Sequence, residues 1–429
     1  MHSAALVPRT SHPAGAVTVA AAAAAGAALA LLAVWALSPR ADGDGDGLPL
    51  VCVGDYEAAA RRKLSQRRGK EAGVQHYFFG GAGDGLSQAR TARALARVLL
   101  RPRALCDVSA PSIAHALLGG PTAAPFGIAP TAFHGLLAAE GELATARAAA
   151  AAGVAYCVSS SSSVPFEAVA AGAPGGRRLA QLYLRTTRAA NAAVVARAEA
   201  AGAEAIVLTV DRPVLGTRDA NQRSGFTLPG RHPADRSANT PAEGSACAYH
   251  DATISDSLSW ADVEWLVRQT RLPVVLKGIL CGEDGAAAVA AGVAGVWVSA
   301  HGGRQLDGVA APAEALVEVL AAVRAAEAEA AARQPPAPHP AAARARVAVW
   351  VDGGVRRGAD VVKYLALGAD HVWVGLAVVA GLAVRGEDGV AAVLRILAEE
   401  TTTAMQLLGA RRVADILPSH ARLAPADCW

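Results

Sequence analysis

The sequence lacks any closely spaced group of cysteines. Its six cysteines are far apart, with no CxxC pair and no cysteine and histidine cluster at metal-ligand spacing. This spacing indicates free, mostly buried thiols in a reducing compartment and predicts no zinc site. Strong charge is missing as well, because the formal net charge is +3 and the basic residues are dispersed. We therefore expect no nucleic acid as the main partner, whereas a small anionic substrate is compatible with this balance.

The chain does contain enough apolar residues to bury a large core. Of its 429 residues, 53% are hydrophobic and 18% are charged, a composition that excludes a disordered protein. One barrel of roughly 250 to 350 residues would absorb most of this length.

Residues 1–47 differ in composition from the rest of the chain. They contain an uncharged, alanine-rich run at 16–37, about the length needed to cross a bilayer, followed by Arg40 and a Gly-Asp repeat. We interpret 1–47 as a targeting or anchoring segment with a flexible tether, and 48–429 as one barrel domain. A single transmembrane anchor, a long signal peptide and an organellar transit peptide all fit. An untargeted extension is the remaining interpretation.

From about residue 125, short runs rich in β-branched residues alternate with alanine-rich helical runs, as is typical of an α/β fold. Eight strands are predicted, at 125–130, 154–160, 180–184, 205–211, 272–278, 295–300, 346–354 and 371–377. Helical patterns lie between them, at 141–152, 189–201, 260–270, 285–291, 312–331 and 359–367. Several of these end at a glycine, as at Gly153, Gly202, Gly292 and Gly368.

Eight strands, each followed by a helix, predict a (β/α)8 TIM barrel. An open doubly wound sheet is the alternative, weakened by the lack of a GxGxxG sequence after the first strand. Two insertions interrupt the alternation. We interpret 218–257, which follows the fourth strand, as a mobile lid over the barrel mouth. The proline-rich stretch 334–340 is interpreted as a surface spacer.

Polar side chains lie at or near the C-terminal ends of the predicted strands, where a barrel gathers its reactive groups. They are Thr131, Ser159, Gln181, Tyr183, Thr209, Asp211, Lys277, His301 and Asp352. One such residue alone is more simply a hydrogen-bonded core group, but nine in phase with eight strands indicate a site. Lys277 stands as a lone cation, so it should face a group that becomes negative, such as a reduced flavin.

The segment 301–308 carries the most specific local signal. The apolar run 295–299 is followed by His301, two glycines and Arg304. A base and a cation therefore lie at the end of a buried strand. The glycines keep the backbone open to a flat ligand and a small substrate. Taken alone, a strand-to-loop turn with a solvated histidine and arginine is an alternative interpretation.

Together these residues resemble the FMN-dependent α-hydroxy acid oxidase and dehydrogenase family, which includes glycolate oxidase and flavin-type L-lactate dehydrogenases. The resemblance covers about residues 55 to 417 and rests on the segments 101–103, 129–132, 181–183, 208–211, 276–278, 299–307 and 351–358. It implies a (β/α)8 barrel with FMN at the C-terminal mouth, and a homotetramer.

The resemblance also implies roles for individual residues. His301 matches the base that takes a proton as the substrate α-carbon loses a hydride equivalent to flavin N5, and Asp211 pairs with it. Arg304 matches the contact to the substrate carboxylate, and Arg218 a second, more mobile one. Two phenols that contact substrate oxygens correspond to Tyr77 and Tyr183.

The cofactor contacts are implied in the same way. Lys277 matches a lysine near flavin N1 and O2, where it would stabilise the anionic reduced ring. Contacts to the isoalloxazine and the ribityl chain correspond to Thr131, Ala132, Ser159, Gln181, Thr209 and Ser299. Contacts to the ribityl chain and the phosphate correspond to Asp352, Gly353, Arg356, Gly375 and Leu376.

Three residues depart from the family pattern. Leu376 stands where the family usually has an arginine on the FMN phosphate, so phosphate binding relies on Arg356 and backbone N–H groups. Ala300 replaces the usual asparagine before the base. Ser161 replaces a bulky aromatic over the substrate side chain, which indicates a wider or differently shaped pocket.

The resemblance implies FMN-dependent oxidation of an L-2-hydroxy acid to the 2-oxo acid. Oxygen is the expected electron acceptor, giving hydrogen peroxide, and a membrane anchor would instead favour a quinone or a cytochrome. The C-terminus is not of the Ser-Lys-Leu peroxisomal type, and no haem domain is recognisable before the barrel. The alternative hypothesis, motivated by Leu376 and Ala300, is a membrane-tethered barrel that has lost tight FMN binding and acts as a scaffold.

Overall fold

The computed structural model describes residues 49–226, 254–333 and 346–425, and eight parallel strands within them form a closed barrel. In chain order the strands are β4 (Phe126–Ile128), β5 (Tyr156–Val158), β6 (Arg178–Leu182), β7 (Ile206–Thr209), β8 (Val274–Ile279), β9 (Gly295–Val298), β10 (Ala348–Asp352) and β11 (His371–Val374). The last strand pairs with the first, Val372 opposite Phe126. This closure confirms the TIM barrel and excludes the open doubly wound sheet.

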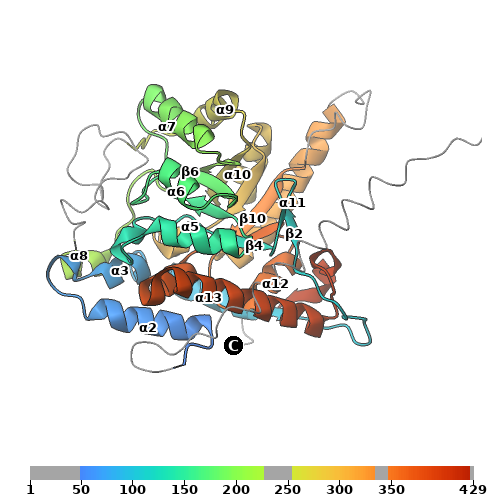
Figure 1. Ribbon diagram of the computed structural model, residues 1–429. Helices are drawn as coiled ribbons and strands as arrows, with labels where there is room; N and C mark the ends of the chain where they lie inside the picture. Colours follow the sequence, from blue (N-terminus) through green and yellow to red (C-terminus); the bar gives the residue numbers. More distant parts are fainter. Residues whose placement is uncertain (1–48, 227–253, 334–345, 426–429) are drawn as a thin grey trace, which may run out of the picture. The chain divides into compact units, whose positions relative to one another are not determined.

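A helix follows each strand, as the barrel requires (Figure 1). The outer helices are α5 (Glu142–Ala151), α6 (Phe166–Gly172), α7 (Arg188–Ala200), α8 (Asp219–Ser224), α9 (Trp260–Gln269), α10 (Gly282–Ala290), α11 (Pro312–Arg333), α12 (Gly358–Ala366) and α13 (Leu376–Leu408). The strands between them are almost wholly buried, which explains why the sequence shows them as continuous apolar runs. The glycines expected after α5, α7, α10 and α12 have positive φ and end these helices.

Most predicted boundaries differ from the observed ones by one or two residues, and two differ by three. Helix α10 begins at Gly282 rather than at residue 285, because the acidic Glu283 and Asp284 occupy its first turn, where the helix dipole favours them. The eighth strand ends at Val374 instead of residue 377, since Leu376 already begins helix α13.

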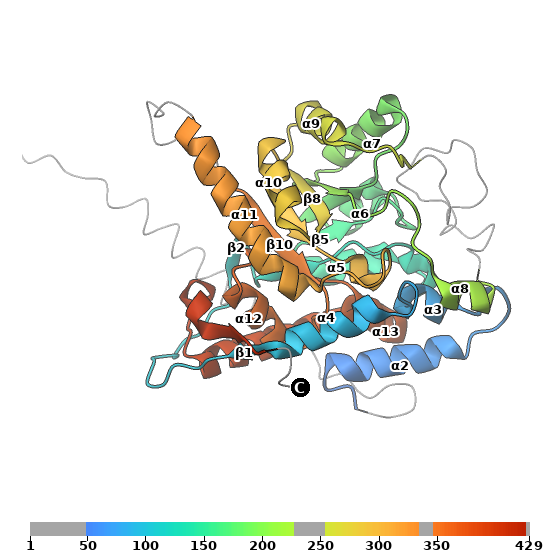
Figure 2. The same cartoon turned by 180° about the vertical axis from the view of Figure 1, so that it is seen from behind.

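The segments before the barrel pack around it (Figure 2). They comprise α2 (Val53–Ser65), α3 (Val74–Phe79), α4 (Leu86–Arg97), β1 (Val98–Leu100), β2 (His115–Leu117) and β3 (Gly120–Thr122). Helix α2 packs against α13, and β1 pairs with the C-terminal strand β12 (Ala421–Leu423). Short 3-10 turns complete the described chain at Gly69–Glu71, His134–Leu136, His301–Gly303, Val413–Asp415 and Pro418–His420.

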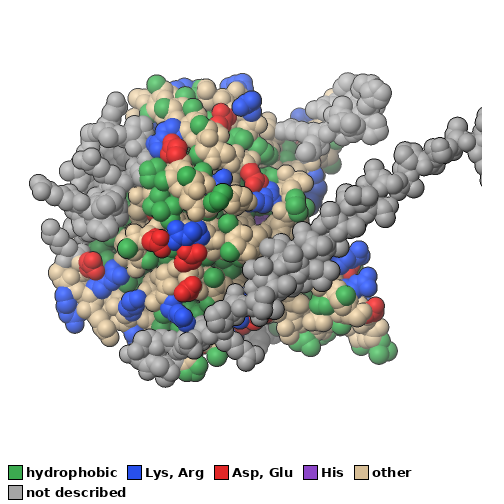
Figure 3. All heavy atoms as spheres, in the orientation of Figure 1, with side chains coloured by type: hydrophobic (Ala, Val, Ile, Leu, Met, Phe, Trp, Pro, Cys, Tyr) green, Lys and Arg blue, Asp and Glu red, His purple; other side chains and the backbone are tan. Residues whose placement is uncertain are grey.

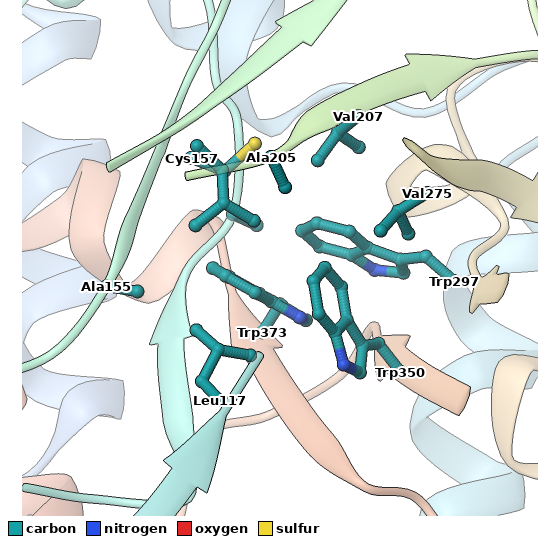
Figure 4. Packing of buried hydrophobic residues seen from close by; sticks show 11 residues of the cluster. Leu117, Ala155, Cys157, Ala205, Val207, Val275, Trp297, Trp350 and Trp373 are labelled. Carbon is teal, nitrogen blue, oxygen red and sulfur yellow. The ribbon is translucent and has the colours of Figure 1, made fainter. Parts of the chain in front are cut away.

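Three tryptophans fill the barrel interior (Figure 4). Trp297 stacks on Trp373 with ring centroids 4.5 Å apart, and Trp350 packs against both. Gly127 makes room for this layer, since a Cβ there would lie 2.7 Å from the Trp373 ring. Burial of three indoles gives this layer a large share of the hydrophobic stabilisation.

Several predictions concern residues outside the described ranges, namely the segment 1–47, most of the proposed lid 218–257, and the spacer 334–340. Among the described residues, no helix has the length and apolarity needed to cross a membrane. The four described cysteines are free thiols, as predicted. The prediction that they are buried is wrong for three of them, because only Cys157 is buried. On the face shown in Figure 3, basic and acidic side chains are interspersed.

Candidate active site

One large cavity, of about 510 Å³, opens at the C-terminal ends of the barrel strands. It brings together every site residue that the sequence predicted, except Asp211 and Ser299, which lie directly behind its wall. The location agrees with the general rule that barrel enzymes build their sites from the loops after the strands.

His301 and Asp211 form a hydrogen-bonded pair at this mouth. The two atoms His301 Nδ1 and Asp211 Oδ1 lie 2.7 Å apart, so the carboxylate holds Nδ1–H and leaves Nε2 to accept a proton. Burial lowers the pKa of His301, and the neighbouring Asp211 offsets part of that shift. Burial alone would raise the pKa of Asp211, but His301 and Lys277 together lower it. The pair is therefore a neutral imidazole beside an ionised carboxylate at neutral pH.

A glycine allows this carboxylate to reach the histidine. Gly278, at a φ of 109°, lies so close to Asp211 that a Cβ would approach the Asp211 side chain to 2.6 Å. His301 itself has a φ of 53°, a conformation that few residues other than glycine adopt. The pair thus depends on local backbone geometry in two different loops.

Arg304 and Arg218 lie on the cavity wall, and Arg218 Nε donates to the carbonyl of Arg304 at 3.3 Å. Arg304 Nη1 donates to the carbonyls of Phe78 and Gly80, at 3.3 and 2.8 Å, and its guanidinium lies 5.4 Å from the Tyr77 ring centroid. Arg218 Nη2 donates to Gln305 Oε1 at 3.3 Å. Gln305 Nε2 in turn donates to the carbonyl of Asp211 at 3.1 Å. This linkage fixes the two loops that carry the base and both cations.

Lys277 is not the lone cation that the sequence indicated. Its Nζ lies 3.2 Å from Asp352 Oδ2 and donates to Ser299 Oγ at 2.8 Å, while Ser299 Oγ donates to Asp352 Oδ1 at 2.8 Å. Burial alone would lower the pKa of Lys277, but Asp352, Asp211 and Tyr183 together raise it. The lysine is therefore a buried permanent cation that faces the cavity.

A second polar network forms the opposite part of the floor. Gln181 donates from Nε2 to Thr209 Oγ1 at 3.0 Å and accepts from Ser159 Oγ at 3.2 Å. Thr131 contacts a fully buried histidine behind the wall, with Thr131 Oγ1 and His134 Nε2 2.5 Å apart. These groups present a row of donors and acceptors at the C-terminal ends of four neighbouring strands.

The end of the cavity near α13 can hold an anion. Gly353 and Gly354 have positive φ, and the first N–H groups of α13 at Leu376 are not used within the helix. Arg356 is the cation here, but its Nε forms an ion pair with Glu57, which also lines the cavity. Part of the positive charge expected of Arg356 is thus neutralised by the protein itself.

These features fit FMN. The cavity combines a buried cation, Lys277, with a row of amide and hydroxyl groups for a polar ring edge, and with backbone donors for a phosphate. The residues that would hold it are those predicted, with Leu376 contributing apolar contact and a backbone N–H rather than charge. Within the described residues, no group of histidine, cysteine or carboxylate side chains is arranged to hold a metal ion.

Sequence reasoning missed four residues that shape the site. Glu57, Gln305, His134 and Arg212 all contact predicted residues, yet none follows from a local pattern. Glu57 lies on a helix far from Arg356 in sequence, so no signal could have found it. Gln305 stands inside the recognised segment 299–307, and its neighbours could have drawn attention to it.

A barrel of this kind, with a histidine and carboxylate pair, two arginines and a buried lysine around one cavity, fits the class of flavin-dependent hydroxy acid oxidoreductases. Residues 66–423 match the model of the FMN-dependent dehydrogenase family. The 2-hydroxyacid oxidase 2 of Homo sapiens is 40% identical over 86% of this chain and 97% of its own. Glycolate oxidase of Spinacia oleracea is 41% identical over 87% and 96%.

A solved structure agrees with these sequence relatives. Mandelate oxidase with (S)-2-phenylpropionate matches with a TM-score of 0.74 and 39% identity, covering 87% of this chain and 98% of that one. The chain belongs to the FMN-dependent dehydrogenase family, and FMN is its cofactor. The predicted class is confirmed, and the comparisons give no support to a scaffold without flavin.

Proposed function

We propose that this protein oxidises (S)-2-hydroxy acids to 2-oxo acids and passes the electrons to molecular oxygen. The observation that carries the proposal is the His301 and Asp211 pair, 2.7 Å apart, in one cavity with Arg304, Arg218 and Lys277. A base, carboxylate-binding cations and a buried cation near a flavin are the groups that this reaction needs.

Each residue has a distinct task. Arg304 and Arg218 bind the substrate carboxylate, and a planar guanidinium matches its two oxygens. Tyr77 and Tyr183 offer hydroxyl groups to the substrate oxygens. His301 Nε2 accepts the proton, while Asp211 stabilises the imidazolium that forms. When bound, FMN accepts the hydride equivalent that the α-carbon loses.

The choice of acceptor rests on the relatives. The similar proteins are named oxidases, among them an L-lactate oxidase of a Nostoc strain that is 40% identical to this chain. Oxygen as the acceptor gives hydrogen peroxide as the second product. A quinone or a cytochrome is the competing acceptor if residues 1–47 anchor the protein to a membrane.

The test is anaerobic flavin bleaching by a panel of 2-hydroxy acids with increasing side-chain size, followed by peroxide measurement in air. The His301→Gln variant should keep its flavin and reduce it at least about a hundredfold more slowly. Reduction of this variant at the parent rate would overturn the role of His301. Peroxide in less than stoichiometric yield would favour another acceptor.

Assembly and location are part of the same proposal. We infer a homotetramer from the family resemblance, and delivery to a membrane or an organelle from the composition of residues 1–47. Light scattering of the flavin-loaded protein tests the first inference, and a dimeric mass would contradict it.

A further inference from the structure

Arg212 lines the cavity but has no role in the chemistry above. It follows Asp211 directly, its side chain is partly exposed, and its guanidinium lies 4.9 Å from the centroid of the Tyr183 ring. Among the described residues, no carboxylate forms an ion pair with Arg212 and no acceptor takes a hydrogen bond from it.

The other cations of the cavity differ in this respect. Lys277 pairs with Asp352, and Arg356 pairs with Glu57. Arg304 donates to two backbone carbonyls, and Arg218 donates to Gln305. A cation above an aromatic ring uses the face of the guanidinium and leaves its N–H groups, which point outward in the plane, for another acceptor.

The position of Arg212 favours an acceptor on the substrate side chain. Arg212, Tyr183 and Thr209 line both the main cavity and a second cavity of about 270 Å³. The second cavity is mostly apolar, with Trp260 and Leu276 among its lining residues. Ser161, which follows β5, also lines the main cavity, and its small side chain occupies little of the space there.

We propose that Arg212 is a specificity-determining residue that binds a distal carboxylate, so that the preferred substrates are 2-hydroxy dicarboxylic acids. This inference rests on the proposed function, in which Arg304 and Arg218 bind the carboxylate beside the reacting carbon. A carboxylate matches the guanidinium edge in a charge-assisted, bidentate contact. A neutral side chain would cover Arg212 without replacing its hydrogen bonds to water, and this loss gives discrimination.

The kinetic test compares each dicarboxylate with its own distal amide, which has the same shape without the charge. The probes are (S)-malate, (S)-2-hydroxyglutarate and (S)-2-hydroxyadipate. For the best fitting chain length, kcat/KM should favour the acid over its amide by about ten- to a hundredfold, the factor of one charge-assisted hydrogen bond. Arg212→Gln should bring this ratio close to one, and Arg212→Lys should keep part of it.

A matched control is Arg188→Gln. Arg188 lies on α7 outside the cavity, and its guanidinium also lies over an aromatic ring, 5.0 Å from the Trp265 centroid. Its replacement should leave the ratio of acid to amide unchanged. A ratio near one for all three acids in the parent protein, or a ratio that survives Arg212→Gln, would overturn the inference.

A binding measurement separates this inference from the proposed function. Calorimetry on the flavin-loaded protein compares 2-oxoglutarate with its distal amide, in the parent and in Arg212→Gln. If the acid binds more tightly than the amide in the parent but not in Arg212→Gln, the role of Arg212 is supported even where no turnover is seen. Equal binding of acid and amide in the parent contradicts that role. Failure of every 2-hydroxy acid to bleach the flavin would instead contradict the proposed function.

Discussion

At the scale of single residues, Asp211 fixes the orientation of the His301 ring and raises the pKa that burial lowers. Its Oδ1 holds His301 Nδ1, and its Oδ2 is buried with no hydrogen-bond partner among the described residues. No second hydrogen-bond donor therefore draws the negative charge of this carboxylate away from the imidazole. The pair therefore combines a base of lowered pKa with a fixed stabiliser of the protonated form.

The pH profile should report this pair. Since burial lowers the pKa of His301, kcat/KM of the parent should be level near neutral pH and fall as pH drops through a value below 6.5. In Asp211→Asn the contribution that raises the pKa is lost, so this limb should move to lower pH. The plateau should fall about a hundredfold or more, because an amide does not stabilise the imidazolium. A limb that moved to higher pH would contradict the assignment.

Gly278 offers a second test at the same scale. Gly278→Ala adds a Cβ only 2.6 Å from the Asp211 side chain, at a φ of 109°. We expect a thermal midpoint lower by a few degrees and a large loss of kcat, because Asp211 must move from His301. The matched control is Gly85→Ala, at a φ of 76° with open space around it, which should cost stability alone. Full activity of Gly278→Ala would show that the pair tolerates displacement.

At the scale of elements, the helices before the barrel hold the active-site turn. Ala82 N donates to Gly303 O at 2.7 Å, and Gln88 Nε2 donates to Gly302 O at 3.2 Å. Asp307 caps the start of α4 by accepting from Ser87 N at 2.7 Å and Leu86 N at 3.1 Å. The turn that carries His301 is therefore fixed by a segment more than two hundred residues earlier in the chain.

Asp307→Ala should release this turn. The backbone N–H groups of α4 lower the pKa of Asp307 to about 2, so its contribution to stability is present above about pH 4 and is lost as pH falls toward 2. Loss of the cap should cost about 0.5 to 2 kcal/mol and lower kcat/KM several-fold at neutral pH. Asp415→Ala is the control, because it removes a similar contact, to Arg412 N at 2.8 Å, far from the cavity. It should lower the stability of the protein and leave kcat/KM unchanged. Equal kinetics in the two variants would contradict the coupling.

The start of α13 supports a prediction on cofactor affinity. Leu376 contributes no charge to the phosphate end, and Glu57 neutralises part of Arg356. Leu376→Arg should therefore lower the Kd of FMN about ten- to a hundredfold. Leu407→Arg adds the same charge at an exposed position near the other end of α13 and should leave the Kd unchanged. The measurement is flavin titration of the apoprotein at one ionic strength, and equal Kd values for parent and Leu376→Arg would show that other donors suffice.

At the scale of the whole molecule, the barrel could be predicted from the sequence, but the contacts between distant residues that surround the site could not. Buried parallel strands are continuous apolar runs with polar residues at their ends, so Thr209, Lys277 and Asp352 were found from position alone. The ion pairs of Lys277 and Arg356 join residues 75 and 299 positions apart, and local patterns carry no signal for such pairs. The same holds for the layer of Trp297, Trp350 and Trp373, which depends on the space left by Gly127.

The domain boundary is the last prediction at this scale. The first described helix, α2, is capped by Asp55, whose Oδ2 accepts from Val51 N and Cys52 N at 2.9 Å each. Deletion of residues 1–47 leaves these contacts and the packing of α2 on α13 intact. We expect the truncated protein to keep the thermal midpoint, flavin content and kcat/KM of the full chain. Deletion of residues 1–56 removes the cap and should lower the midpoint.

The same boundary separates location from chemistry. Residues 1–47 fused to a fluorescent reporter should carry it to a membrane or an organelle, because their alanine-rich run has about the length and apolarity of a targeting or anchoring segment. A scrambled version of 16–37 with charged residues inserted is the matched control and should leave the reporter diffuse. A diffuse reporter with the native segment would rule out both anchor and targeting, and loss of activity in the truncated protein would show that 1–47 belong to the catalytic unit.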